Sequence, residues 1–451
     1  MRGIWAVAKN TIKQALRMKI AVVFIIMLLV LLPVLGITTT GDETLKGRLQ
    51  TFVSYGLSLT SLLLCLLTII ISIYTVTSDI KYRQIYTVIT KPIRRYQFLL
   101  GKLLGIMIID IVLLVLFSSF IYFFALYMPS FYKATEDEIS QVNNEFYTAR
   151  AALTIPEVDV SQEVKEKYQE LERIGRLPPE YSREQVIEEL TAQAKLRHRA
   201  ADVGQKLIWE FKDVKPLTES MFIRFKYEVA VTPPDMQIYG RWYAGDPEYV
   251  KTGKQPESEP FERILKHSVD TYHEIEFPAD VVPENKRMAV AFMNIPLNRT
   301  SITFPADGLM VLYKADTFTA NYIRAVLLIL LRLIFLACLG IMTSTFVSFP
   351  VAVLVCLVLF STASISAFII DSFVLLGENM SLVYSLSIKW MIRLLPQFDK
   401  FNPTSFIVPA RLLSWLTLAK CALFMVFIQS AILLVLAFIT FGCREIAKII
   451  V

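Results

Sequence analysis

The sequence predicts an α-helical membrane protein of six transmembrane helices with one inserted extracytosolic α+β domain, and three observations support this. Apolar residues make up 55% of the 451 residues and the mean hydropathy is +0.51, more than a soluble domain of this length normally carries. These residues gather in runs that exceed the roughly 18 to 20 residues needed to cross the hydrocarbon core of a bilayer. One polar stretch, about 129–318, holds most of the acidic residues and all three histidines, and it is long enough to form its own core.

The N-terminal segment 1–19 predicts an amphipathic helix on the cytosolic interface. It carries five basic residues and no acidic residue, while apolar side chains recur at helical spacing. The apolar run that follows, 20–37, is expected to be a retained first span. A cleaved secretory signal is the alternative, but this run is long for a signal and lacks a clear cleavage site of small residues.

Charge sets the expected orientation of the spans. The segment 77–102 carries six basic residues against one acidic residue, which by the positive-inside rule places it in the cytosol. An even number of spans then places both termini in the cytosol and the polar stretch on the far side. The remaining expected spans are 52–76, 103–127, 321–347, 349–376 and 418–442.

Five parts follow along the chain. They are the cytosolic elbow helix 1–19, the first three spans 20–127, the extracytosolic domain 128–319, the last three spans 320–442 and the cytosolic tail 443–451. Within the last three spans, the segment 377–417 contains a moderately apolar stretch, 382–395, followed by the breaker-rich 396–403. The apolar stretch is too short and polar to span, so we expect a helix that dips into the outer interface. Its basic residues would then lie outside, against the usual charge bias; they are Lys389, Arg393, Lys400 and Arg411.

The inserted domain is expected to be a helical hairpin followed by a small β-sandwich. Its first half, 134–212, is rich in Glu, Lys, Gln and Ala, a composition typical of solvated helices. From about residue 220 onward apolar and polar residues alternate, as in 222–229, and Pro and Gly residues mark turns.

No arrangement of residues in the polar region indicates an enzyme. The best cluster is His267, His273, Glu274 and Glu276, but in a strand the two glutamates share one face and His273 points to the other, so a solvated sheet edge is the simpler interpretation. The five cysteines lie in or beside apolar runs, so we expect buried structural thiols, no metal site and no disulfide framework. The net charge of +6 requires no nucleic acid partner, because the basic residues gather where membrane topology places them.

Two ionisable residues lie inside expected spans, where burying a charge is costly. Asp110 lies about two turns into the third span and Arg332 lies near the middle of the fourth. We expect an intramembrane ion pair between them. Its role is either to fix helix packing or to serve a substrate pathway or a conformational switch.

The segment 77–102 reads TSDIKYRQIYTVITKPIRRYQFLLGK, in which an acidic residue and a short helix precede a Lys-Pro-Ile and a Leu-Leu-Gly-Lys sequence. It resembles the cytosolic coupling segment of ABC-2 type permeases, the membrane subunits of ABC exporters. Gln84 stands where that family often has a threonine. The N-terminal elbow, the hairpin at 344–352 and the terminal Arg444-Glu445 are also similar, whereas the resemblance does not cover the large insertion between the third and fourth spans.

The resemblance implies a half-transporter: two six-helix permeases pair, and two separate ATPase subunits that bind ATP and Mg dock beneath them. This chain is then not itself an enzyme and holds no cofactor, and the Gly101-Lys102 pair, followed by leucines, is no nucleotide-binding loop. A helix at 79–90 is expected to act as a lever on the ATPase. The residues expected to contact the ATPase subunit are Asp79, Lys81, Arg83, Lys91, Arg94 and Arg95. The alternative role of these charges is to set topology and bind anionic lipid.

Three interpretations of function remain open at this point. The first is ATP-driven export of a bulky or amphiphilic substrate across the bacterial inner membrane. The second is a mechanical transmitter, in which the ATPase cycle moves the inserted domain so that it acts on an extracytosolic protein partner. The third is a membrane-anchored binding or scaffold module without an ATPase partner.

Overall fold

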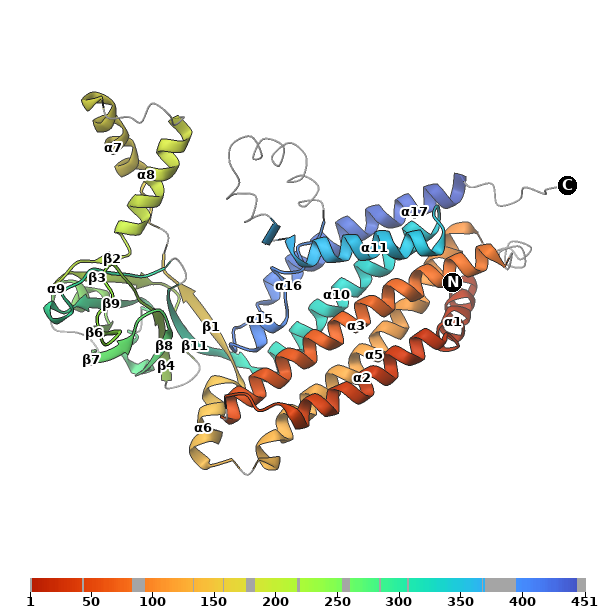
Figure 1. The fold of residues 1–451 in the computed structure, drawn as a ribbon, viewed down its shortest axis with the longest axis horizontal. Helices are drawn as coiled ribbons and strands as arrows, with labels where there is room; N and C mark the ends of the chain where they lie inside the picture. The colour runs from red at the N-terminus through yellow and green to blue at the C-terminus, as the bar shows by residue number, and fades with distance from the viewer. Residues whose placement is uncertain are drawn as a thin grey trace. The chain divides into compact units, whose positions relative to one another are not determined.

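The computed structural model describes residues 2–42, 44–82, 94–132, 134–156, 158–175, 183–216, 220–253, 260–283, 285–305, 308–366, 368–369 and 395–443. They fold into two compact units, drawn as ribbons in Figure 1. The helical unit is built from Met1–Ala149 and Thr317–Val451, and the β-rich unit from Arg150–Asp316. The β-rich unit is therefore an insertion in the chain between the two parts of the helical unit.

Among the described residues, the helical unit contains five helices that are long and apolar enough to cross a membrane: α2, α3, α5, α10 and the continuous helix Trp415–Cys443. Its described elements are α1 (Arg2–Leu16), α2 (Lys19–Thr38), α3 (Leu45–Lys81), α5 (Arg95–Phe131), α6 (Glu136–Glu145), α10 (Phe318–Ser344), α11 (Phe349–Ser364), α15 (Thr404–Ile407), α16 (Trp415–Ala422), the π-helix η4 (Leu423–Ser430) and α17 (Ala431–Cys443). A multi-pass helical membrane protein is thus confirmed. The sixth span stays a prediction, because α11 covers 16 residues of the expected 349–376 and the rest reaches beyond the described residues.

Helix α3 lies at the centre of the helical unit. It packs against α2, α5, α10 and α11, and Figure 1 shows it running beside α5 and α10. Most of the apolar stretch of α3 and α10 is buried within the unit, whereas α2 and Trp415–Cys443 expose most of theirs, as helices facing lipid do. With 37 residues each, α3 and α5 continue past the expected spans 52–76 and 103–127, because the hydrogen bonds within a helix form in water as well as in the hydrocarbon core.

The elbow helix α1 packs on the first half of α5 at two glycines spaced four residues apart. A Cβ added at Gly101 would lie 2.6 Å from the Cβ of Val7, and one added at Gly105 would lie 2.7 Å from the Cβ of Thr11. The two glycines therefore let the helix backbones approach closely, as small residues do at helix contacts in membranes. The predicted elbow helix is present, and one of its faces is buried against α5.

The β-rich unit holds a helical hairpin and three small sheets. Its helical elements are α7 (Ser161–Ile174), α8 (Arg183–Arg197), α9 (Pro247–Thr252), η1 (Ala279–Val281) and η2 (Pro296–Asn298). Its strands are β1 (Thr148–Thr154), β2 (Ala200–Ala201), β3 (Lys206–Phe211), β4 (Ser220–Lys226), β5 (Glu228–Val229), β6 (Gln237–Gly245), β7 (Phe261–Ser268), β8 (Tyr272–Pro278), β9 (Met288–Asn294), β10 (Ile302–Thr303) and β11 (Leu309–Thr317). The sheets have the strand orders β1-β11-β4-β8, β2-β10-β5 and β3-β9-β6-β7.

Alternation of buried and partly exposed residues builds the core of this unit. In β6 every second side chain is buried, as expected of a strand with one face on a core. Trp242 from β6 packs on Phe225 from β4, with ring centroids 4.5 Å apart, and on Phe292 from β9, at 5.1 Å. The expected order of a helical hairpin followed by strands is found for α7, α8 and the strands after them. Strand β1, which precedes the hairpin and pairs at the edge of a sheet, was not expected.

The β-rich unit, Arg150–Asp316, is shorter than the expected domain 128–319, because the residues that follow α5 pack in the helical unit. Val142 and Phe146, in and just after α6, are buried in the core of the helical unit. Lys46 of α3 forms an ion pair with Glu145 at the end of α6. The residues around α6 therefore belong to the membrane-spanning unit by their packing.

Candidate functional site

A buried polar network joins three helices where α3 ends and α5 begins. The Lys102 ammonium of α5 lies 2.6 Å from Asp79 Oδ2 of α3, and it donates to Gln14 Oε1 of α1 at 3.0 Å. The Gln14 amide donates to Ser78 Oγ at 2.6 Å and to Asp79 Oδ1 at 3.3 Å. The side chains of Lys102 and Asp79 are only 0% and 4% exposed. The Lys102–Asp79 ion pair and the Gln14 amide thus connect α1, α3 and α5.

The position of Asp79 corrects one expectation. We expected Asp79 to open a separate coupling helix and to contact an ATPase subunit, but it lies in the last turn of α3 and its carboxylate faces Lys102. Each of these charges loses its hydration on burial, so each needs the other as a partner. In this structure Asp79 therefore holds α3 to α5 rather than facing a partner protein.

Gln14 and Lys102 were not among the predicted site residues. The available signal for Lys102 was a lysine at the very start of an apolar run, directly after Gly101. Its ammonium also lies 5.5 Å from the centroid of the Phe98 ring, a cation–π distance. Gln14 carried no comparable signal, because one glutamine in an amphipathic helix is ordinary.

Arg95, at the start of α5, binds the end of α17. Its Nη1 donates to the backbone carbonyl of Gly442 at 2.6 Å and to that of Phe441 at 3.3 Å. The last carbonyls of a helix have no partner within the helix, and the helix dipole favours a cation there. The ring of Phe441 also stacks on Phe98, with centroids 5.8 Å apart. Arg95 therefore has a structural role in addition to the predicted contact with a partner.

The remaining basic residues of the predicted contact divide into two groups. Lys81, at the end of α3, and Arg94, just before α5, are both exposed. Arg83 and Lys91 lie outside the described residues. Lys81 and Arg94 are thus the two described side chains of this set that are available to another molecule.

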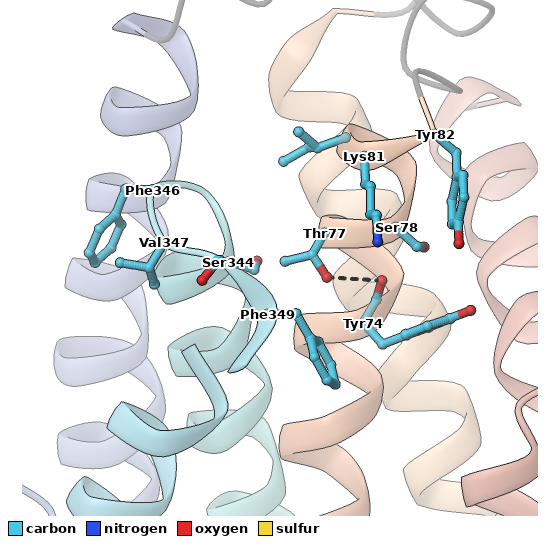
Figure 2. A pocket seen from close by; sticks show the side chains of 11 residues that line it. Tyr74, Thr77, Ser78, Lys81, Tyr82, Ser344, Phe346, Val347 and Phe349 are labelled. Carbon is cyan, nitrogen blue, oxygen red and sulfur yellow. Dashed lines mark hydrogen bonds between the residues drawn. The ribbon is translucent and has the colours of Figure 1, made fainter. Parts of the chain in front are cut away.

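A cavity of about 430 Å³ lies beside the buried network, between the end of α3 and the turn that joins α10 to α11 (Figure 2). Its described lining is Tyr74, Thr77, Ser78, Ile80, Lys81, Tyr82, Ser344, Phe346, Val347, Ser348 and Phe349. Figure 2 shows the α3 side chains on one wall, with the Lys81 ammonium among them, and the α10–α11 turn on the other. Ser78 connects the two features, since it lines the cavity and also accepts the hydrogen bond from Gln14.

The predicted ion pair between Asp110 and Arg332 is not formed. Asp110 Oδ1 accepts a hydrogen bond from Thr68 Oγ1 of α3 at 2.9 Å, and its Oδ2 is buried without a hydrogen-bond partner among the described residues. Arg332 Nη2 donates to the backbone carbonyls of Phe398 and, at 2.7 Å, Phe401. Each residue is therefore bound by a different part of the helical unit.

The partners of Arg332 belong to an irregular segment, 395–414, that packs along α10. It contains only the four-residue helix α15 and reaches Arg332, the fifteenth of the 27 residues of α10. Irregular backbone at membrane depth is tolerated only where protein groups satisfy its polar atoms. The short interfacial helix expected at 382–395 lies, except for its last residue, outside the described residues, whereas the described segment 395–414 after it is held against α10.

Two further side chains of α10 bind the same segment nearer the start of the helix. Asn321 Nδ2 donates to the carbonyl of Arg411, and Asn321 Oδ1 accepts from the amide of Leu413, both at 2.8 Å. Arg324 Nη1 donates to the carbonyl of Leu413 at 3.2 Å. With Arg332, these residues provide a row of side-chain hydrogen bonds along one side of α10.

The histidine and glutamate cluster of the β-rich unit has a structural arrangement. In β8, Glu274 and Glu276 are exposed on one face, as predicted, and Glu274 Oε2 accepts from Arg150 Nη1 at 2.9 Å. The rings of His267 and His273 lie 4.7 Å apart. Burial, and then the nearby His273, lower the pKa of His267 to about 4. In the described part of the chain, no group of three or more His, Cys, Asp or Glu side chains could hold a metal ion.

Comparison of the chain with models of known protein families, with curated proteins and with solved structures finds no match. Its function is therefore inferred from its residues and their geometry. The end of the helical unit that holds the buried network, the exposed Lys81 and Arg94 and the cavity is the best candidate for a functional site. The chain carrying it is a multi-pass helical membrane protein with a separate β-rich unit.

Proposed function

We propose that this chain is the membrane permease subunit of an ATP-driven ABC-2 type transporter, which exports a bulky or amphiphilic substrate while a separate subunit hydrolyses ATP. The observation that carries the proposal is the segment 77–102, whose sequence resembles the ATPase-coupling segment of that family. The described ends of this segment are fixed to each other through Asp79 and Lys102. A force applied to the segment would therefore act on α3 and α5 together.

Two further contacts support transmission of movement from this end of the molecule. Gln14 extends the buried network to α1, and Arg95 connects the start of α5 to the end of α17. Close-packed interiors have low compressibility and transmit displacement from one element to the next. Four helices would thus respond to a partner that pushes on Lys81 and Arg94.

The charge at this end supports a cytosolic location for it, in the inner membrane of a bacterial cell. Exposed basic residues here are Lys9, Lys13, Arg17, Lys19, Lys81, Arg94 and Arg95. Among residues 2–19, 77–82 and 94–102 the one acidic residue is Asp79, and it is neutralised by Lys102. An excess of basic residues beside spanning helices is typical of the cytosolic side. Both α1 and the end of α17 lie here, so both termini would be cytosolic.

The partners follow from the same proposal. ATP and Mg would be bound by an ABC ATPase subunit, because no nucleotide-binding loop motif occurs in this chain. A second copy of the permease, or a homologue, would complete the membrane pore. The exposed Arg94 is the described arginine best placed for contact with the ATPase.

Mild-detergent affinity purification of the full chain tests this proposal. We expect an ATPase subunit to co-purify, and we expect Arg94→Glu to reduce its recovery. The matched control is Arg411→Glu, an exposed arginine whose own carbonyl is bound by Asn321 near the opposite end of α10. Purification without any ATPase, in wild type as in both variants, would contradict the proposal and favour a binding or scaffold module.

A mechanical transmitter is the second candidate, and the connection between β11 and α10 favours it. The chain passes from β11, which ends at Thr317, into α10, which begins at Phe318, without an intervening loop. A movement of α10 would therefore pull directly on a strand of the β-rich unit. Reconstitution of the complex in vesicles separates the two candidates. Cargo movement supports export, whereas ATP hydrolysis stimulated only by an extracytosolic protein supports transmission.

A further inference from the structure

The cavity between α3 and the α10–α11 turn has, in its described lining, mostly apolar side chains and one cation. Aromatic and aliphatic side chains from both walls line it, among them Tyr74, Phe346 and Phe349. Tyr74 and Phe349 meet edge to face, with ring centroids 6.2 Å apart. Lys81 is the charged residue of the described lining. A ligand that fits this lining has an apolar part and an anionic group.

The charge of Lys81 is not neutralised by the described residues around it. Asp79, two residues earlier, has both oxygens engaged, one with Lys102 and the other with Gln14. In the described part of the chain no carboxylate lies within salt-bridge distance of the Lys81 ammonium, which lies 5.9 Å from the centroid of the Tyr82 ring. An anion can therefore pair with Lys81 without displacing a carboxylate partner among the described residues.

The cavity also lies where lipid headgroups would be found. It is formed at the ends of two membrane-spanning helices, α3 and α10, and at the start of the apolar helix α11. Tyrosine rings, here Tyr74 and Tyr82, are enriched at the boundary between hydrocarbon and headgroups. Basic pockets between spanning helices are known to hold anionic headgroups.

From these observations we infer that the cavity binds an anionic phospholipid. The phosphate pairs with the Lys81 ammonium, and the first acyl carbons lie against Phe349 and the other apolar side chains. The hydroxyl of Ser348, which is exposed at the start of α11, is available to the headgroup. Because Ser78 borders both the cavity and the buried network, a bound lipid would brace the end of α3. Lipid binding here requires no ATPase partner.

Native mass spectrometry of the purified full chain tests this site. The chain is exchanged into detergent with equal amounts of phosphatidylglycerol and phosphatidylcholine, and the lipids retained on the protein are counted. We expect wild type to retain phosphatidylglycerol preferentially. Lys81→Gln should lower that preference about fivefold, the factor that one basic residue near an anionic surface contributes, and Lys81→Arg should preserve it. Lys9→Gln, which removes an exposed lysine of α1 away from the cavity, should leave it unchanged.

A second variant tests the cavity itself. Ser348→Trp fills the space from the α11 side and keeps Lys81, so it should abolish retention of phosphatidylglycerol. In detergent without added lipid, its thermal unfolding midpoint should equal that of wild type. Millimolar inorganic phosphate should fail to displace the lipid. Equal retention in wild type, Lys81→Gln and Ser348→Trp would overturn the inference, and so would displacement by inorganic phosphate, which would indicate a site for a free anion.

Discussion

The Lys102 ammonium lies 2.6 Å from the Asp79 carboxylate, and both side chains are almost completely buried. Twenty-two residues lie between the two in the sequence, and over this stretch the chain leaves α3 and enters α5. Their pairing brings the two ends of segment 77–102 together. The two ends of the segment that resembles an ATPase-coupling element are therefore held next to each other by a buried ion pair.

Breaking this pair from one side should destabilise the protein more than removing it altogether. Removing one partner leaves a buried, uncompensated charge, which costs roughly 3–5 kcal/mol, whereas removing both leaves none. We expect Asp79→Asn and Lys102→Met each to lower the thermal unfolding midpoint, and the double variant to lower it less than either single variant. Unfolding of the four proteins in detergent gives the coupling energy. Strictly additive effects would show that the pair does not interact.

Arg94 and Arg95 are adjacent, but the structure predicts different consequences for them. Arg95→Glu should lower the thermal unfolding midpoint, because a carboxylate would face the carbonyls of Phe441 and Gly442 that the guanidinium now binds. Arg94→Glu should leave the midpoint within the error of wild type, since the side chain is exposed, and should reduce ATPase recovery. If the two variants had the same midpoint, the assignment of Arg95 to the end of α17 would be incorrect.

Arg332 should control the order of segment 395–414. Arg332→Met removes two hydrogen bonds from a charged donor to the carbonyls of Phe398 and Phe401, each worth about 1.5–3 kcal/mol. We expect amide hydrogen exchange in peptides covering 398–403 to accelerate roughly tenfold or more. Lys400→Gln, in the same segment but exposed, is the control and should show the wild-type rate. An unchanged rate in Arg332→Met would mean that other contacts hold the segment.

The β-rich unit should lose stability in mild acid through His267. Burial holds the pKa of His267 at about 4, below its usual 6.5, so the folded unit keeps this side chain neutral. As the pH falls from about 6.5 to about 4, the unfolded chain takes up a proton that the folded unit does not, and stability decreases over that interval. Above pH 6.5 His267 is neutral in the folded and in the unfolded chain, so it causes no loss of stability there.

Hydrogen exchange of peptides from β7 and β8 measures this effect in the full chain. After correction for intrinsic rates, protection should be lower at pH 5 than at pH 7 in wild type, and the difference should shrink in His267→Phe. The ring of His273, 4.7 Å away, is retained in that variant, so any remaining difference arises from groups other than His267. A wild-type protection that is independent of pH would contradict the assigned pKa.

The membrane-spanning helices could be predicted from the sequence because lipid imposes a length and a polarity on each run. The limits of α3 and α5 could not, since a helix continues past the hydrocarbon core without any change in its own hydrogen bonding. The elbow helix 1–19 was predicted from its charge and spacing, and it is present as α1.

The candidate site was only partly predictable. Segment 77–102 was identified from its motif, but the pairing of Asp79 with Lys102 depends on how α3 and α5 are rotated against each other, which no local pattern encodes. Arg332 was identified as a costly charge within a span, but its partners are backbone carbonyls, and every residue carries one. The sequence therefore indicated where polar groups are needed more reliably than it indicated their partners.

The most direct test of the central claim is ATP hydrolysis by the chain before and after its peripheral subunits are removed. The complex is purified in mild detergent, washed with high salt, and then recombined with the washed fraction. If the chain is a permease subunit that depends on a separate ATPase, ATP hydrolysis is lost on washing and restored on recombination. Hydrolysis that persists in the washed chain, or that is absent before washing, would contradict the proposal.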